Sequence, residues 1–257
     1  MKDTFFIGYA ERAPQGLTRW LISISAFLLI LSAIVGFLLA RSQNYFGESV
    51  FEYGITEIYV GQYSASPAPM LTVASDNGEQ PSTYLLVMEG KHGAAESFEN
   101  YKGKSVSFDG TKIYRGKLQM LEVRASSIAG APETIGVARI QPKYVGHVIL
   151  RGEIVDSKCF LGVMNPGEKT VHRACGELCI RGGIPPLLIL RDQDGAVTQL
   201  LLTGPSGEAI NQIILPFVAQ PVRVAGEMYA YGDLLELRID PGAVLLLRGP
   251  ATYSETK

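Results

Sequence analysis

The chain has 257 residues, of which 47% are hydrophobic, and it contains 28 glycines and 14 prolines. This composition excludes a disordered protein and fits a turn-rich globular body joined to an apolar segment. The net charge of -2 argues against a surface that neutralises phosphates, so we expect no nucleic-acid partner.

The first predicted element is a transmembrane helix over residues 20–40. No charged side chain occurs in this stretch, and Arg19 and Arg41 flank it. A stretch of this length crosses the hydrocarbon core of a bilayer. A cleaved signal peptide is the alternative, but its apolar region is shorter, about 7–15 residues, and residues 38–40 make a poor cleavage site.

Basic residues around the span predict its orientation. Lys2 and Arg12 precede it, whereas after Arg41 no Lys or Arg occurs until Lys91. By the positive-inside rule, residues 1–19 lie in the cytoplasm and the C-terminal body lies in the periplasm. We therefore expect a single-pass protein of the bacterial inner membrane, with the lipid bilayer as one partner.

The body shows short β-rich runs broken by Gly, Asp and Asn, and these runs occur twice. The second strand of each copy, at 71–73 and 187–189, aligns at an offset of 116 residues. The same offset relates the later segments, 106–110 with 222–226 and 121–123 with 237–239. Several segments in one register indicate an internal duplication.

Each copy is predicted to have three strands, a short helix and two further strands. The first copy has strands near 53–64, 70–75, 82–88, 104–111 and 117–128, with a helix near 94–101. The second has strands near 146–157, 186–192, 197–203, 221–230 and 234–247, with a helix near 207–215. Hairpin turns are expected at Asp76-Asn77-Gly78 and Asp194-Gly195.

This element order resembles the OB-fold, a small Greek-key barrel. We predict a mainly β fold with two tandem OB-like five-stranded barrels after one N-terminal transmembrane helix. The barrels cover residues 50–128 and 144–248, with a linker at 129–143. The resemblance concerns architecture and implies no particular activity.

A single span followed by a periplasmic OB-like body also resembles the haem chaperone family of cytochrome c maturation. That resemblance would imply haem attachment through a histidine in a short C-terminal motif. Residues 251–257 contain no histidine, so the family's mechanism is not expected here.

The two copies differ by an insert between the first and second strands of the second copy. The first strands align Gly61 with Gly152, an offset of 91, whereas the second strands align at 116. The difference is 25 residues, roughly 159–183. The insert contains all three cysteines of the chain, and OB-folds use the corresponding loop for ligands.

The insert predicts a metal site formed by Cys159, His172, Cys175 and Cys179. Asn165-Pro166 is typical of a helix start and Gly182-Gly183 of its end, so a helix over 166–181 would carry the last three ligands on one face. Thiolate and imidazole suit zinc, copper or an iron–sulfur centre.

Two other interpretations of the insert remain open. In an oxidising compartment, Cys159 could form a disulfide with Cys175 or Cys179, or the thiols could perform redox chemistry. Asp156 and Lys158, which flank Cys159, are interpreted as a solvated pair at a strand end.

No catalytic motif occurs in the sequence, so we do not expect an enzyme. The first functional hypothesis is a non-catalytic accessory or electron-transfer subunit of a bacterial inner-membrane redox complex, with other membrane-protein subunits as partners. The alternatives are a periplasmic metal or haem chaperone, and a structural assembly module with a disulfide-stapled loop.

Overall fold

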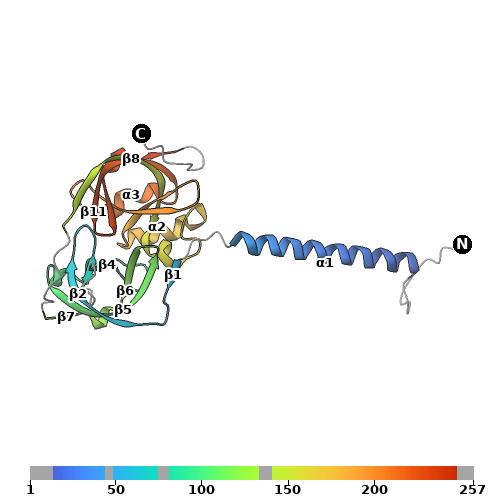
Figure 1. Cartoon of the computed structure of the whole chain (residues 1–257), viewed down its shortest axis with the longest axis horizontal. Helices are drawn as coiled ribbons and strands as arrows, with labels where there is room; N and C mark the ends of the chain where they lie inside the picture. Colours follow the sequence, from blue (N-terminus) through green and yellow to red (C-terminus); the bar gives the residue numbers. More distant parts are fainter. Residues whose placement is uncertain (1–13, 44–48, 75–80, 133–140, 248–257) are drawn as a thin grey trace. The chain divides into compact units, whose positions relative to one another are not determined.

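The computed structural model describes residues 14–43, 49–74, 81–132 and 141–247. The chain forms two compact units, which comprise residues 1–47 and 48–257 (Figure 1).

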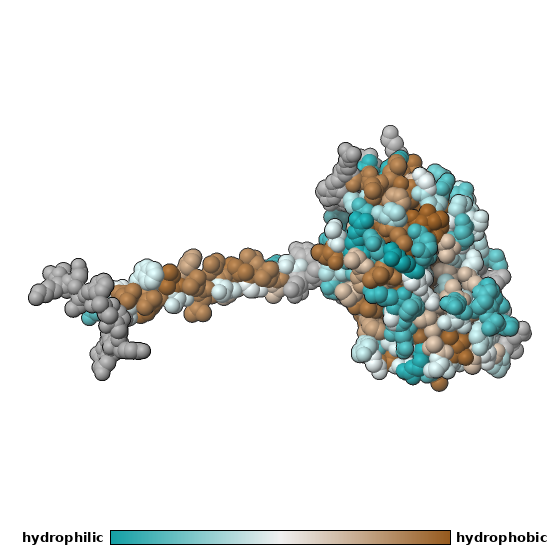
Figure 2. Space-filling view, turned by 180° about the vertical axis from the view of Figure 1, so that it is seen from behind, coloured by the Kyte–Doolittle hydropathy of each residue, from teal (hydrophilic) through white to brown (hydrophobic). Residues whose placement is uncertain are grey.

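The first unit contains one apolar helix, α1 (Gln15–Gln43). Within its segment Gln15–Ser42, the most apolar stretch of 18 residues has a mean hydropathy of 2.6 and is not buried. Figure 2 shows apolar side chains along most of its length. At a rise of about 1.5 Å per residue the helix exceeds the ~30 Å core of a bilayer. It is therefore long and apolar enough to span a membrane, and it includes the predicted span at 20–40.

The second unit begins with a barrel that has two short strands added to it. The additions are β1 (Ser49–Phe51) and β7 (Ala129–Gly130), and both pair with β5. The five barrel strands are β2 (Glu57–Ser64), β3 (Met70–Val73), β4 (Ser82–Met88), β5 (Ser105–Arg115) and β6 (Leu118–Val123).

The second barrel repeats this arrangement. One short added strand, β13 (Leu245–Leu246), pairs with β11. The five barrel strands are β8 (Lys143–Asp156), β9 (Pro186–Arg191), β10 (Val197–Thr203), β11 (Pro221–Tyr231) and β12 (Leu234–Ile239).

Strand pairing in both barrels follows the OB-fold order. The first strand pairs antiparallel with the second and fourth, and the third pairs antiparallel with the second and parallel with the fifth. Pairing of the fourth strand with the fifth closes each barrel. The predicted mainly β fold with two five-stranded OB-like barrels is confirmed.

The helical turns of the two copies correspond, but they are shorter than predicted. Between the third and fourth strands lie η1 (Glu99–Tyr101) in the first barrel and α3 (Asn211–Ile214) with η5 (Leu215–Phe217) in the second. Turns this short have little stability of their own, and tertiary packing of the equivalent buried residues Phe98 and Ile214 supports them.

A second pair of turns explains why the fifth strands end early. The turns η2 (Ala125–Ser127) and η6 (Pro241–Ala243) lie at the 116-residue offset and follow β6 and β12. They end strands that were predicted to continue to residues 128 and 247.

The pairing register confirms the duplication at the first and fourth strands. Gly61 pairs with Val106, and Gly152 pairs with Val222. These are the residues that the sequence alignment made equivalent, so each pair occupies the same place in its barrel.

The predicted alignment of the second strands is wrong by one residue. Gln62 pairs with Thr72, and Glu153 pairs with Ile189, so the second strands correspond at an offset of 117 and not 116. The run of leucines and isoleucines in β9 matches β3 in either register. A one-residue shift reverses the side-chain faces, and it lengthens the insert from 25 to 26 residues, the difference between 117 and 91.

Each barrel has its own apolar interior, and a third cluster joins them. Leu71 lies in the first interior and Leu188 in the second. The shared cluster takes equivalent outward-facing residues from both copies, Met70 with Leu187 and Leu85 with Leu201. The two barrels therefore pack through the same face and form one compact unit.

Two predicted connections lie partly or wholly outside the described residues. The turn at Asp76-Asn77-Gly78 falls there, as do residues 133–140 of the predicted linker. Ala129 and Gly130 of that linker form β7, and β8 begins at Lys143. The turn predicted at Asp194-Gly195 is present, with Gly195 at a φ of 87°.

Candidate metal centre

The insert forms three short helical segments between β8 and β9, and Figure 1 shows the longest of them, α2, between the two barrels. The carboxylate of Asp156 accepts a hydrogen bond from the backbone N–H of Cys159 at 2.8 Å, which caps the first turn. The segments are η3 (Cys159–Val163), η4 (Thr170–His172) and α2 (Arg173–Arg181).

The predicted helix over 166–181 is therefore wrong at its start. Asn165 and Pro166 lie in a loop, and α2 begins at Arg173. Glu168 in this loop accepts two hydrogen bonds from Arg191, at 2.7 and 2.9 Å, which hold the loop against β9. The predicted end is correct, because Gly182 caps the helix and Gly183 adopts a φ of 96°.

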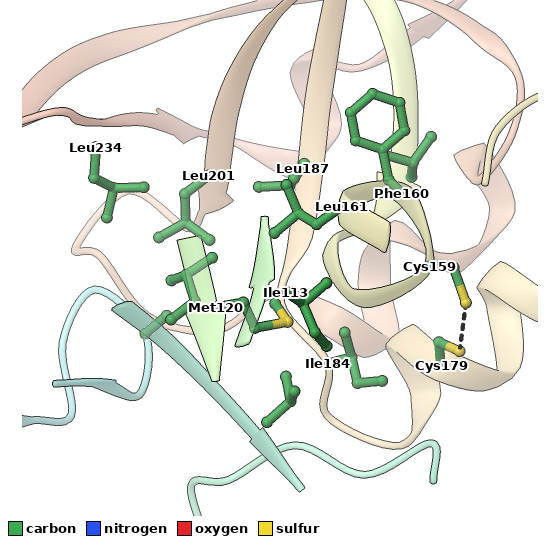
Figure 3. Packing of buried hydrophobic residues seen from close by; sticks show 14 of the residues in the cluster. Ile113, Met120, Cys159, Phe160, Leu161, Cys179, Ile184, Leu187, Leu201 and Leu234 are labelled. Carbon is green, nitrogen blue, oxygen red and sulfur yellow. Dashed lines mark hydrogen bonds between the residues drawn. The ribbon is translucent and has the colours of Figure 1, made fainter. Parts of the chain in front are cut away.

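All four predicted ligands come together around Cys159. Its sulfur lies 3.9 Å from the sulfur of Cys179, and the two face each other in Figure 3. Ligand atoms of Cys159, His172 and Cys175 all lie within 4.8 Å of one another. Cys159 and Cys179 are buried and Cys175 is half-buried. Three free thiols and one imidazole thus form one cluster.

Asp156 is a site residue that the sequence interpretation missed. Its side chain is fully buried, and its Oδ2 lies 2.8 Å from Nε2 of the buried His172. A carboxylate that is hydrogen-bonded to a metal-binding histidine fixes the orientation of the imidazole ring. Asp156 also belongs to a second group with Cys159 and Cys179, whose ligand atoms lie within 4.8 Å of one another.

Lys158 is likewise buried, so the interpretation of Asp156 and Lys158 as a solvated pair is wrong. The Lys158 ammonium forms an ion pair with Glu122 of the first barrel. It also donates hydrogen bonds to the carbonyl oxygens of Met88 at 2.9 Å and Gly90 at 2.7 Å. A buried ammonium requires such partners, and here all of them belong to the other barrel.

A second lysine reaches the cluster from the first barrel. The Nζ of Lys91 lies 2.7 Å from the sulfur of Cys175 and 3.5 Å from that of Cys179. The hydrogen bond to Cys175 is the main reason why the pKa of Lys91 is raised. The cluster is therefore completed by both copies of the duplicated fold.

Hydrogen bonding sets different proton affinities for the two buried thiols. The pKa of Cys179 is lowered, first by its hydrogen bond with Cys159 and then by the nearby ammonium of Lys91. The same bond, together with burial, raises the pKa of Cys159. Of the two buried thiols, Cys179 therefore has the lower pKa and the greater thiolate character.

The start of the insert is also fixed to the first barrel. The guanidinium of Arg115 lies 4.2 Å from the ring centroid of Phe160 and donates to the Phe160 carbonyl oxygen at 3.0 Å. Phe160 and Leu161 belong to the shared apolar cluster (Figure 3). Phe160 and Leu161, which directly follow Cys159, are thus fixed by Arg115 and by the shared apolar cluster.

No protein-family model, curated protein or solved structure matches this chain.

Proposed function

We propose that the insert binds a metal ion through Cys159, His172, Cys175 and Cys179, and that the protein is a non-catalytic accessory or electron-transfer subunit of a bacterial inner-membrane redox complex. One observation carries this proposal: two free thiols, Cys175 and Cys179, and the His172 imidazole lie around the thiol of Cys159, and Asp156 contacts that imidazole. Soft sulfur donors with one nitrogen suit zinc, copper(I) or an iron–sulfur centre.

The sulfur spacing favours a metal over a disulfide. Two thiolates on a tetrahedral zinc with bonds of ~2.3 Å are about 3.8 Å apart. Cys159 and Cys179 are separated by 3.9 Å, whereas a disulfide would require their sulfurs to approach to ~2 Å. The spacing of these two sulfurs is therefore that of two thiolates on one metal ion, without further movement of either residue.

The role beside a membrane complex follows from the apolar helix. A single span would hold the metal centre at the membrane surface, close to membrane-protein subunits. The basic residues before the span and their scarcity after it favour a periplasmic body. A compartment of that kind is also where a thiol site benefits from burial, because burial limits oxidation.

A metal chaperone is the second candidate. Cys175 is half-buried and the Lys91 beside it is exposed, so one edge of the cluster is open to solvent. An open edge permits a ligand-exchange step with a partner's donor group, whereas a purely structural zinc site is closed.

The test uses the full chain, purified in mild detergent without added metal. Metal content by mass spectrometry and free thiols by titration are measured on the same sample. We expect about one metal per chain, lost in His172→Ala and in Cys175→Ser. The matched control is His147→Ala, which changes an exposed histidine of β8 and should retain the metal.

Two further readouts separate the alternatives. A spectrum that changes on reduction supports electron transfer, and transfer of the metal to a competing thiol chelator supports the chaperone. A metal-free chain with a single free thiol and a disulfide at Cys159 would contradict both and would leave a stapled docking loop.

A further inference from the structure

The side chain of Lys91 contacts two of the proposed metal ligands. Its ammonium contacts the sulfurs of both Cys175 and Cys179, at 2.7 and 3.5 Å. A cation bound to the same sulfurs competes with the ammonium for their lone pairs and for the same space. The residue lies on the exposed side of the cluster, whereas Cys179 and His172 are buried behind it.

We propose that Lys91 is a displaceable cationic lid, which a thiophilic metal ion must push aside to enter and which returns to the sulfurs when the metal leaves. This inference rests on the proposed metal site and adds how that site exchanges its metal. The lid comes from the first barrel and the ligands come from the second, so exchange depends on the contact between the two copies.

The backbone that carries the lid is fixed on both sides. Lys158 binds the carbonyl oxygens of Met88 and Gly90, just before Lys91. After it, the N–H of Gly93 donates to the carbonyl oxygen of Gly182 at 2.8 Å. A Cβ at Gly182 would collide with the carbonyl oxygen of Lys91. Opening is therefore a movement of the flexible lysine side chain and not of the loop.

The first test follows the lid in the unmodified chain. Acetylation of each lysine by an amine-reactive ester is mapped by mass spectrometry, with and without added zinc and, separately, copper(I) under anaerobic conditions. We expect metal loading to increase acetylation of Lys91 severalfold, because the displaced amine becomes free in solvent. Lys117, whose side chain is 84% exposed, is the internal control and should not change.

The second test removes the lid. Lys91→Met should bind zinc about tenfold more tightly or better, because the metal no longer replaces a charged hydrogen bond. Lys91→Arg keeps a cation and should stay near the wild-type affinity. Lys117→Met controls for the loss of one positive charge.

The outcomes separate the lid from the metal site itself. If metal binds but Lys91 becomes less reactive, or Lys91→Met binds more weakly, then the ammonium stays on the thiolates and the lid is disproved while the site stands. If neither the wild type nor Lys91→Met binds metal, both proposals fail.

Discussion

The loops between the first and second strands differ sharply in the two barrels. In the first barrel, residues 65–69 make a short connection from β2 to β3. In the second, residues 157–185 hold every cysteine of the chain and the buried His172, whose imidazole contacts the carboxylate of Asp156 at the end of β8. The strand pairing is otherwise the same, so one OB-like scaffold supports a plain loop in one copy and a reactive cluster in the other. Fold and site are thus separable.

The plain copy still contributes to the cluster. Lys91 and Arg115 of the first barrel contact the insert of the second, and Glu122 of the first barrel contacts Lys158 just before the insert. Contacts from both barrels therefore hold the insert in place. The contribution of each barrel to stability can be measured separately.

The largest loss of stability is expected when the contacts between Lys158 and the first barrel are removed. Lys158→Met removes a buried ammonium and leaves Glu122 and two carbonyl oxygens without it, which should cost about 3–5 kcal/mol of unfolding free energy. Denaturant unfolding of the full chain in detergent measures this change. A loss below about 1 kcal/mol would mean that water replaces the ammonium and that the contacts of Lys158 with the first barrel are not needed for stability.

The shared apolar cluster is tested by two neighbouring leucines. Leu187 faces the shared cluster and Leu188 the interior of the second barrel, and both are fully buried. Truncation of either to alanine should cost about 2–5 kcal/mol. Because the barrels share a core, we expect one cooperative transition in each variant. Two separate transitions, of which Leu188→Ala moves only one, would show that the barrels unfold independently.

Gly61 and Gly152 test whether equivalent positions of the two barrels contribute equally to stability. A Cβ at Gly61 or Gly152 would collide with the carbonyl oxygen of Thr72 or Ile189, at equivalent places in the two barrels. Alanine at either position should therefore cost a similar amount, about 1–3 kcal/mol. The same denaturant measurement applies. A marked difference between the two variants would mean that the insert has loosened the first two strands of the second barrel.

The fold was predictable because its determinants are local and repeated. Alternating apolar runs and turn residues define the strands of each copy. The pair Gly61–Val106 matches the pair Gly152–Val222, so the first and fourth strands take the same place in each barrel. The error of one residue occurred in β9, where consecutive leucines give no sign of which face is inside.

The candidate site was only partly predictable. Spacing alone brought together Cys159, His172, Cys175 and Cys179, because they lie within one insert. Asp156 had a signal that was misread. Aspartate is a typical N-cap residue, and its carboxylate here accepts from the N–H of Cys159, three residues later. Lys91 had no signal, since its approach to the thiols depends on how the two barrels pack, and that contact is not encoded by any short motif.

The smallest effect is expected at another pair of equivalent residues, Lys117 and Asp233. They lie in the hairpin turns between the fourth and fifth strands of the two barrels, at the 116-residue offset, and their charged atoms are 3.7 Å apart. Their side chains are 84% and 77% exposed, so solvent screens the ion pair. Lys117→Ala should leave the unfolding free energy and the metal content unchanged within error. A clear loss of stability would mean that surface charges hold the copies together. We expect instead that the apolar cluster and the buried Lys158 hold the two barrels together.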